Sequence, residues 1–299
     1  MSTLGWQNIL VTEGGSACRI LIRPLPLIGA IVKIQRPAPP APLAKVEEEV
    51  KKFHPLFAKL ETLDDSQLAE MGRLGYRRDN WPLIASKTII IDLQSSLEEI
   101  TAKFSKDTRQ SLRKAQEHQI RVAAKNFPEP PQESDKDLKN FYDLFQQVSV
   151  RNKFWIPSYK ELWNKAKAFG ERAWVFLAYV QEEKIPCAGA FVLCSDENAY
   201  YFHAATSPAA NTNFAAYANL YQVIEVMKNA GYKKLDLEGI YDERFHETTV
   251  KWKNFTVFKR KWGGEEVTYP GSFTNTYNPF LRQVFNTFAR RYPTESTPS

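Results

Sequence analysis

Two neighbouring motifs near the C-terminal end carry side chains that could do chemistry. The segment LDLEGI at 235–240 has the pattern of a strand and carries Asp236, and a basic, aromatic segment at 252–264 contains the step Phe258-Lys259. A fixed ammonium group beside a flat apolar surface can bind phosphate, stack a base or stabilise an oxyanion. Lys259, Phe258 and Asp236 are therefore candidate catalytic residues, with Asp236 orienting the site or accepting a proton. The structural alternatives are an exposed lysine, a core phenylalanine and an aspartate that caps a helix or pairs with a lysine.

A second set of cations lies on a helix that the pattern predicts at 96–118. Lys106, Arg109 and Arg113 recur at spacings of three and four, so their side chains share one helical face. Such a ridge can bind phosphates, although an ordinary solvated face has the same pattern. Arg151, in the segment SVRNKF, is a further candidate for binding phosphate, and a surface arginine is its alternative.

The composition favours two domains and a polyanionic partner. The 299 residues are 43% hydrophobic, enough for two ordinary cores, and the net charge of +6 favours RNA, nucleotide phosphates or anionic lipid headgroups. The cysteines and histidines lack the spacing of metal ligands, so we expect no metal site and a reducing cytoplasm. The apolar window at 20–34 is too short to span a bilayer, so any membrane contact is predicted to be peripheral.

The first half of the chain alternates between strand and helix signals. The pattern predicts strands at 8–11, 18–22, 25–34, 56–62 and 87–93, an amphipathic helix at 43–53 and a short helix at 64–76. This alternation indicates a sheet covered by helices. A segment rich in proline and charge at 126–137 is typical of a linker, so we predict a first domain at 1–127 and a second at 128–277.

The second half begins with two predicted helices, at 137–151 and 158–169. Three strands with hairpin-like turns follow between 173 and 206, and then a helix and the strand that carries Asp236. This order is that of an N-acyltransferase-like (GNAT-like) fold. The helix carries Tyr217 on the same side as Leu220 and Tyr221, a pattern that favours core packing for all three.

The combined motifs resemble the Fem family of peptidoglycan aminoacyltransferases. That family carries a Phe-Lys step, two further residues, an aromatic residue and glycine after an Asp-containing strand, and this chain has FKRKWGG after LDLEGI. The resemblance extends over nearly the whole chain, through the segments 22–37, 88–122, 149–154 and 199–237.

The resemblance implies an α/β (α+β) fold of two tandem GNAT-like domains, with a C-terminal helix at 278–293 that packs back on the first. The implied reaction moves an amino acid from aminoacyl-tRNA to an amine of a peptidoglycan precursor, UDP-linked or lipid-linked. Lys259 would stabilise the tetrahedral intermediate, and Phe258 would pack beneath the site or stack on the terminal base of the tRNA. The implied substrate-binding residues are Arg151, Arg113, Arg109 and Tyr217.

Further expectations concern cofactors and location. We expect aminoacyl-tRNA as co-substrate with no other cofactor, a cytoplasmic monomer, and peripheral contact with the inner face of the membrane. The apolar stripe of the 278–293 helix fits docking on the first domain or lying on a membrane.

Two alternative functions remain open from the sequence. The first is an acyl-CoA-dependent N-acyltransferase, which shares the fold, but the chain shows no glycine-rich loop after a suitable strand to bind the pyrophosphate of CoA. The second is a non-catalytic protein that binds RNA or the precursor, which the presence of Lys259 disfavours.

Overall fold

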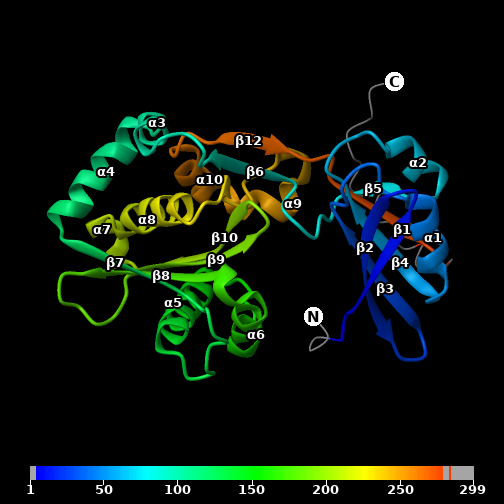
Figure 1. Cartoon of the computed structure of the whole chain (residues 1–299), viewed down its shortest axis with the longest axis horizontal. Helices are drawn as coiled ribbons and strands as arrows, with labels where there is room; N and C mark the ends of the chain where they lie inside the picture. Colours follow the sequence, from blue (N-terminus) through cyan, green and yellow to red (C-terminus); the bar gives the residue numbers. More distant parts are fainter. Residues whose placement is uncertain (1–4, 279–282, 284–299) are drawn as a thin grey trace. The chain divides into compact units, whose positions relative to one another are not determined.

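The computed structural model describes residues 5–278 and Gln283, and the chain forms two compact units (Figure 1). Unit 1 takes its described residues from Met1–Lys87, Gly239–Lys253 and Thr268–Ser299, and unit 2 consists of Thr88–Glu238 and Asn254–Val267. Each unit has one β-sheet with helices packed on it, which confirms the predicted α/β class. The predicted helix at 278–293 lies outside the described residues, apart from its first residue and Gln283.

Within residues 5–278, the sheet of unit 1 has six strands in the order β1-β2-β3-β4-β13-β5. β3 and β4 run parallel, and the other neighbours run antiparallel. The strands are β1 (Gln7–Glu13), β2 (Ser16–Leu25), β3 (Gly29–Gln35), β4 (Pro55–Glu61), β5 (Arg77–Asp79) and β13 (Ser272–Thr276). The helical elements are α1 (Leu43–Lys51), α2 (Leu68–Arg73), η3 (Glu243–Phe245), α9 (His246–Thr249) and η4 (Val250–Trp252).

The core of unit 1 follows from the period-two pattern of its strands. In β2, Cys18, Ile20 and Ile22 are buried, whereas Arg19 and Arg23 on the opposite face are exposed. The predicted amphipathic helix at 43–53 is α1, whose buried face completes this core.

The sheet of unit 2 has seven strands in the described part of the chain, in the order β12-β6-β11-β10-β9-β8-β7. Its strands are β6 (Lys87–Asp92), β7 (Ile120–Asn126), β8 (Ala173–Val180), β9 (Ala188–Ser195), β10 (Asn198–Thr206), β11 (Lys234–Asp236) and β12 (Glu265–Thr268). Its helices are α3 (Leu97–Ala102), α4 (Lys106–Glu117), α5 (Lys136–Asn152), α6 (Tyr159–Phe169), η2 (Gly170–Arg172), α7 (Ala209–Asn213), α8 (Ala215–Asn229) and α10 (Lys253–Arg260).

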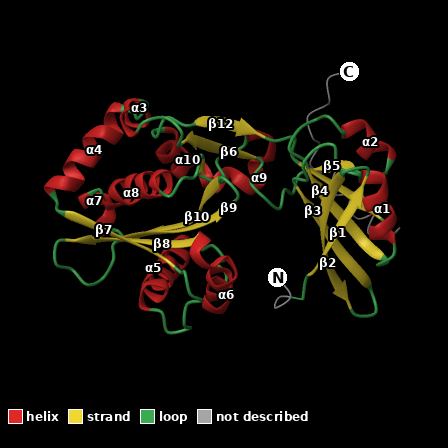
Figure 2. Cartoon of the chain, viewed as in Figure 1, coloured by secondary structure: helices red, strands yellow, loops and turns green. Residues whose placement is uncertain are grey.

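Helices cover both faces of this second sheet, with α5 and α6 on one face and α8 on the other (Figures 1 and 2). Strands β8 and β9 are therefore buried over most of their length, which explains their nearly continuous apolar sequence. The predicted strands between 173 and 206 are confirmed as the antiparallel series β8-β9-β10.

The pairing between β10 and β11 is parallel and short. Only Asn198–Tyr200 pair with Lys234–Asp236, and β11 then ends. Beyond Tyr200 the ladder between β10 and β9 contains an irregularity before His203. Beyond Asp236 the backbone no longer pairs with β10, but it keeps two hydrogen bonds to β6: the Leu237 N–H donates to the Ile89 carbonyl at 2.8 Å, and the Ile240 N–H donates to the Lys87 carbonyl at 3.0 Å.

The predicted domain boundary at residues 127 and 128 does not separate the two units, because it falls inside unit 2 between β7 and α5. The segment 126–137 is a packed loop rather than a linker. Trp163 Nε1 donates to the Pro131 carbonyl at 2.8 Å, and the Tyr159 hydroxyl donates to the Glu133 carbonyl at 2.8 Å. The chain instead passes from one unit to the other at 87–88, 238–239, 253–254 and 267–268.

The helix predicted at 96–118 is two helices, α3 and α4. Ser105 starts the second, because its side chain accepts a hydrogen bond from the Thr108 N–H. Lys106, Arg109 and Arg113 all belong to α4, so the predicted spacing of these three cations along one helix holds.

Candidate active site

The step Phe258-Lys259 lies near the end of helix α10. Successive residues of an α-helix are rotated by about 100°, so the two side chains do not point to opposite sides. Trp262 follows two residues after the helix and is completely buried, which anchors this end of α10.

The Lys259 ammonium is held between a backbone carbonyl and an aromatic ring. Its Nζ donates to the Glu238 carbonyl at 3.2 Å and lies 4.8 Å from the centre of the Phe255 ring. Burial lowers the pKa of Lys259 to about 8, while the carboxylates of Glu238 and Asp236 oppose that shift. The charged form still predominates at pH 7, but this amine titrates much closer to neutrality than a surface lysine does.

The Glu238 carbonyl is positioned by a buried network at the end of β11. Asp236, which is 8% exposed, accepts hydrogen bonds on Oδ1 from the Thr88 hydroxyl and from the Glu238 N–H, the latter at 2.7 Å. Glu238 has φ +63, in the left-handed region that glutamate rarely adopts. Backbone strain of this kind is concentrated at functional sites. The geometry of Asp236 is that of a group that positions the turn at Glu238.

An aromatic cluster adjoins Lys259. The Phe258 ring centre lies 5.1 Å from Tyr217 and 5.8 Å from Trp262, both in edge-to-face geometry, and Trp262 lies 4.9 Å from Phe104. Trp262 and Phe104 are buried, whereas Phe258 and Tyr217 are half-buried at the margin of the cluster. Tyr217 therefore does not enter the core as Leu220 does, and its ring is placed beside Phe258.

Two glycines allow the segment after α10 to lie close to the end of α3 and to β6. A Cβ on Gly263, which has φ +71, would lie 2.4 Å from the Lys103 carbonyl oxygen, and a Cβ on Gly264 would lie 2.6 Å from Ile89 Cγ2. Only glycine fits such approaches. The Gly-Gly pair of the motif therefore has a packing role.

The three candidate arginines lie in different surroundings. Arg109 donates to the carbonyls of Ala102, at 3.3 Å, and of Phe104, so it caps α3. Arg113 is exposed on the same helix, whose first turn is tied to the segment after α10, because the Ser105 N–H donates to the Lys261 carbonyl at 2.9 Å.

Arg151 donates to the carbonyl of Thr206 at the far end of β10, at 2.8 Å. Within unit 2, the structure thus brings together Lys259, Asp236, Phe258 and Tyr217. It places α4 beside the end of α10 and Arg151 at the last residue of β10.

The model of the FemAB family matches this chain twice, over residues 83–184 and 180–290. The chain belongs to the FemAB family. The matches include Lys259, Asp236 and the whole of unit 2, and they support an enzyme of aminoacyl transfer in peptidoglycan bridge formation. A search of curated proteins found no significant sequence match.

Solved structures share the fold of this FemAB protein. A crystal structure of FemX has a TM-score of 0.75 at 16% identity, covering 95% of this chain and 91% of that one. The C-terminal domain of a putative lysylphosphatidylglycerol synthetase from Agrobacterium fabrum has a TM-score of 0.60 at 14% identity, covering 95% and 89%. A tandem GNAT protein from the clavulanic acid biosynthesis pathway has 0.53 at 12%, covering 92% and 83%. The predicted fold of two tandem GNAT-like domains is therefore confirmed.

The sequence analysis missed two contributors to the site of this FemAB protein. Thr88 comes far earlier in the chain, and only the antiparallel pairing of β6 with β11 brings it to Asp236. Glu238 acts through its carbonyl, which no side-chain pattern reveals. One signal for the turn was available. The segment LEG at 237–239 interrupts the strand pattern, and a strand that ends at Asp236 must turn immediately afterwards.

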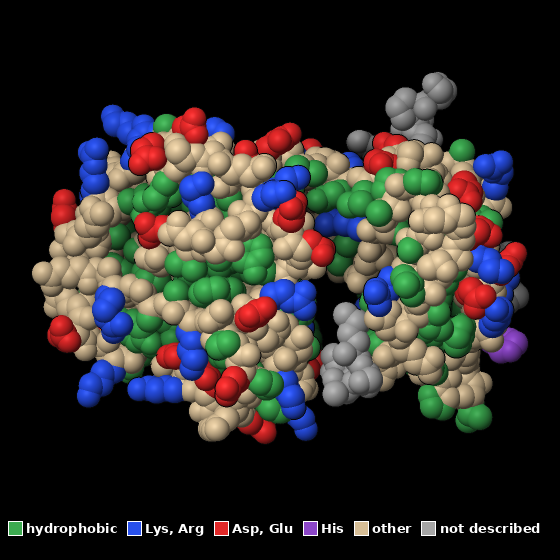
Figure 3. Space-filling model, in the orientation of Figure 1, with side chains coloured by type: hydrophobic (Ala, Val, Ile, Leu, Met, Phe, Trp, Pro, Cys, Tyr) green, Lys and Arg blue, Asp and Glu red, His purple; other side chains and the backbone are tan. Residues whose placement is uncertain are grey.

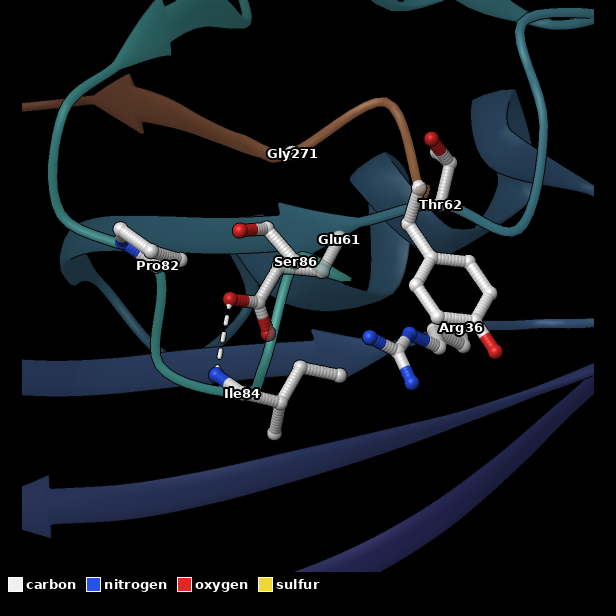
Figure 4. Close-up of a pocket in the computed structure, with 8 residues that line it drawn as sticks. Arg36, Glu61, Thr62, Pro82, Ile84, Ser86 and Gly271 are labelled. Carbon is white, nitrogen blue, oxygen red and sulfur yellow. Dashed lines mark hydrogen bonds between the residues drawn. The ribbon is translucent and has the colours of Figure 1, made fainter. Parts of the chain in front are cut away.

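A separate pocket of the FemAB protein lies in unit 1 (Figure 4). The Arg36 guanidinium stacks 3.5 Å above the Tyr269 ring and donates to the Ala85 carbonyl. Glu61 accepts from the Leu83 N–H at 2.6 Å and from the Ile84 N–H at 3.1 Å, and burial raises its pKa. The charged groups thus hold the loop at 83–85, so we assign this pocket to the structure of unit 1.

The described residues contain no group of three or more His, Cys, Asp or Glu side chains arranged to hold a metal ion. Among the same residues, no helix is long and apolar enough to cross a membrane.

Lys259 is expected to lower the stability of this FemAB protein at neutral pH. Burial lowers the pKa of Lys259 from 10.5 to about 8. At pH values between these two, the unfolded chain therefore binds more protons than the folded chain, and the free energy of unfolding rises with pH. Lys259→Met should raise the free energy of unfolding by about 1 to 2 kcal/mol at pH 7, and the gain should vanish above pH ~10.5.

Denaturant unfolding at pH 7 and 10.5 measures this difference. Lys253→Met, at an exposed position of the same helix, is the matched control: it removes a contact with the Tyr241 ring and should change the free energy of unfolding by less than ~1 kcal/mol, equally at both pH values. A Lys259→Met protein no more stable than the parent at pH 7 would contradict the lowered pKa.

Proposed function

We propose that this FemAB protein transfers an aminoacyl group from aminoacyl-tRNA to an amine on the stem peptide of a peptidoglycan precursor. The observation that carries the proposal is the Lys259 ammonium, fixed at the Glu238 carbonyl within the Phe-Lys motif of the family. The aminoacyl ester is already activated, so the protein must align a neutral amine with its carbonyl and stabilise the charge that develops.

The reaction needs no redox step or external co-reactant. The acceptor nitrogen attacks the ester carbonyl, a C–N bond forms, and the oxygen carries negative charge in the tetrahedral intermediate. Lys259 stabilises that charge. The intermediate collapses as the C–O bond to the tRNA ribose breaks, and the proton lost by the amine ends on the ribose hydroxyl.

The neighbouring residues take supporting roles in this proposal. Asp236 holds the turn at Glu238 and thereby positions Lys259. The half-buried rings of Phe258 and Tyr217 supply a surface on which the terminal base of the tRNA stacks. Arg109, Arg113 and Arg151 supply positive charge for tRNA or precursor phosphates, with Arg109 also capping α3.

We also propose that the protein acts as a cytoplasmic monomer with no cofactor beyond aminoacyl-tRNA, and that it makes peripheral contact with the inner face of the membrane. The net charge of +6 supports an anionic partner such as tRNA. The acceptor is a UDP-linked or a lipid-linked precursor.

The test is transfer of radiolabelled amino acids from a charged total-tRNA pool to UDP-linked and lipid-linked precursors, run beside acetyl-CoA with amine acceptors. Label in a precursor supports the proposal and names both the amino acid and the acceptor. Activity with acetyl-CoA alone would assign the site to an acyl-CoA-dependent transferase, and precursor or tRNA binding without transfer would indicate a binding protein.

A further inference from the structure

The hairpin between β2 and β3 ends in an exposed apolar tip. Leu27 is fully exposed, at 107%, and Ile28 is 60% exposed, next to the exposed residue Pro26. Hydrophobic side chains are visible at the end of unit 1 where this hairpin turns (Figure 3). The proposed transfer chemistry uses none of them, so the tip needs another explanation.

The backbone of the tip makes its sequence more unusual. Leu27 has φ +67, a left-handed conformation that glycine or asparagine adopts more readily than leucine. The Ile28 N–H donates to the Leu25 carbonyl at 3.2 Å and closes the turn. A leucine at this position lowers the stability of the protein, both through its backbone conformation and through its exposure to water. Such an outlier is a reason to look for function.

The charge around the tip is uniformly positive along the hairpin. Residues 16–35 contain Arg19, Arg23 and Lys33 and no acidic residue. Arg23 lies opposite Ile31, close to the turn, and Lys33 lies opposite Leu21, so both cations are on the face of the sheet opposite the core. Lys33 Nζ also lies 4.5 Å from the centre of the Trp6 ring.

This arrangement matches the layers of a membrane surface. Aliphatic side chains favour the boundary between headgroups and acyl chains, while tryptophan and cations favour the headgroup level. A protein partner fits less well, because a specific protein interface buries about 800 Å² on each side. Two side chains at the end of a narrow hairpin present far less surface than that.

We propose that the β2–β3 hairpin is a peripheral contact of this protein with an anionic lipid bilayer. Leu27 and Ile28 enter the interface, and Arg23, close to the turn, binds the phosphates of the headgroups. This inference rests on the peripheral membrane contact of the proposed function, but the hairpin takes no part in the transfer chemistry, so vesicle binding and aminoacyl transfer can each fail alone.

The test is co-sedimentation of the full-length protein with vesicles of phosphatidylcholine and phosphatidylglycerol. The variant carries Leu27→Asn and Ile28→Ser together, because asparagine tolerates the left-handed conformation and the turn is then retained. Its partition coefficient should fall roughly tenfold or more, since two aliphatic side chains no longer leave water. The midpoint temperature of its thermal unfolding should not be lower than that of the parent.

Ile185→Ser is the matched control, because Ile185 is 75% exposed in the β8–β9 turn and lies in unit 2. The control should sediment like the parent. The proposal is overturned if the parent does not sediment with these vesicles, or if the double variant sediments equally well. It is also overturned if sedimentation velocity shows a parent dimer that the double variant converts to monomer, since a second copy would then cover the tip.

Discussion

Replacing Lys259 with methionine is expected to lower kcat for aminoacyl transfer by about two to three orders of magnitude. The ammonium is the group that we place at the developing oxyanion, and removal of one such donor typically costs about 3 to 4 kcal/mol of transition-state stabilisation. Methionine keeps the aliphatic packing against Phe255, so the change tests charge rather than shape. Single-turnover transfer from aminoacyl-tRNA measures the effect apart from product release.

The pH dependence of the same reaction gives an independent check. Burial lowers the pKa of Lys259 to about 8, so kcat/KM of the parent should fall as the pH rises through that value and the ammonium is lost. On the acid side, activity should rise as the acceptor amine loses its proton. Lys259→Arg keeps the charge and should move the falling limb to higher pH.

The matched control for activity is Lys253→Met, which removes an exposed cation from the same helix and should leave kcat within about twofold of the parent. Full transfer activity in Lys259→Met would remove Lys259 from the mechanism. A rise in KM without a change in kcat would assign it to ground-state binding instead.

Replacing Trp262 with alanine is expected to produce the largest loss of stability. Its side chain is completely buried and packs against Phe104, Tyr217 and Phe258, so the substitution opens a cavity that several elements line. Truncations of this kind typically cost about 3 to 5 kcal/mol. Denaturant unfolding followed by far-UV circular dichroism measures the change.

Trp262→Phe separates packing from hydrogen bonding. The indole Nε1 is buried without a hydrogen-bond partner among the described residues, so phenylalanine loses volume but no bond. It should cost less than half as much as alanine. An alanine variant as stable as the parent would show that α10 does not depend on this anchor.

The sequence predicted most of unit 2 because its signals are local. The strands β8, β9 and β10 are apolar runs separated by short turns, and α5 begins at a capping aspartate, Asp135. The domain boundary could not be read in the same way. The loop at 126–137 has the composition of a linker, and only distant donors such as Trp163 show that it is packed.

The candidate site was predictable in its residue types but not in its geometry. Lys259 and Asp236 were found from a motif, whereas the helix that carries Phe258 was not, since a basic, aromatic run fits both a strand and a helix. The contact of Lys259 with the Glu238 carbonyl depends on the turn after β11, and the lowered pKa depends on burial. Both arise from tertiary structure, which a local pattern does not encode.

The place of β13 in the sheet of unit 1 determines the order in which the protein can fold during synthesis. β13 lies between β4 and β5, although it comes almost 200 residues later than β5, so the position between these two strands is still unfilled when Lys87 has been synthesised. Until Ser272–Thr276 emerge, β4 has an unpaired edge of the kind that promotes aggregation. Unit 2 lacks only β12 and α10 at the stage when Glu238 has been made. Unit 1 begins before unit 2 and is completed after it, so the open edge of β4 needs protection until β13 has been synthesised.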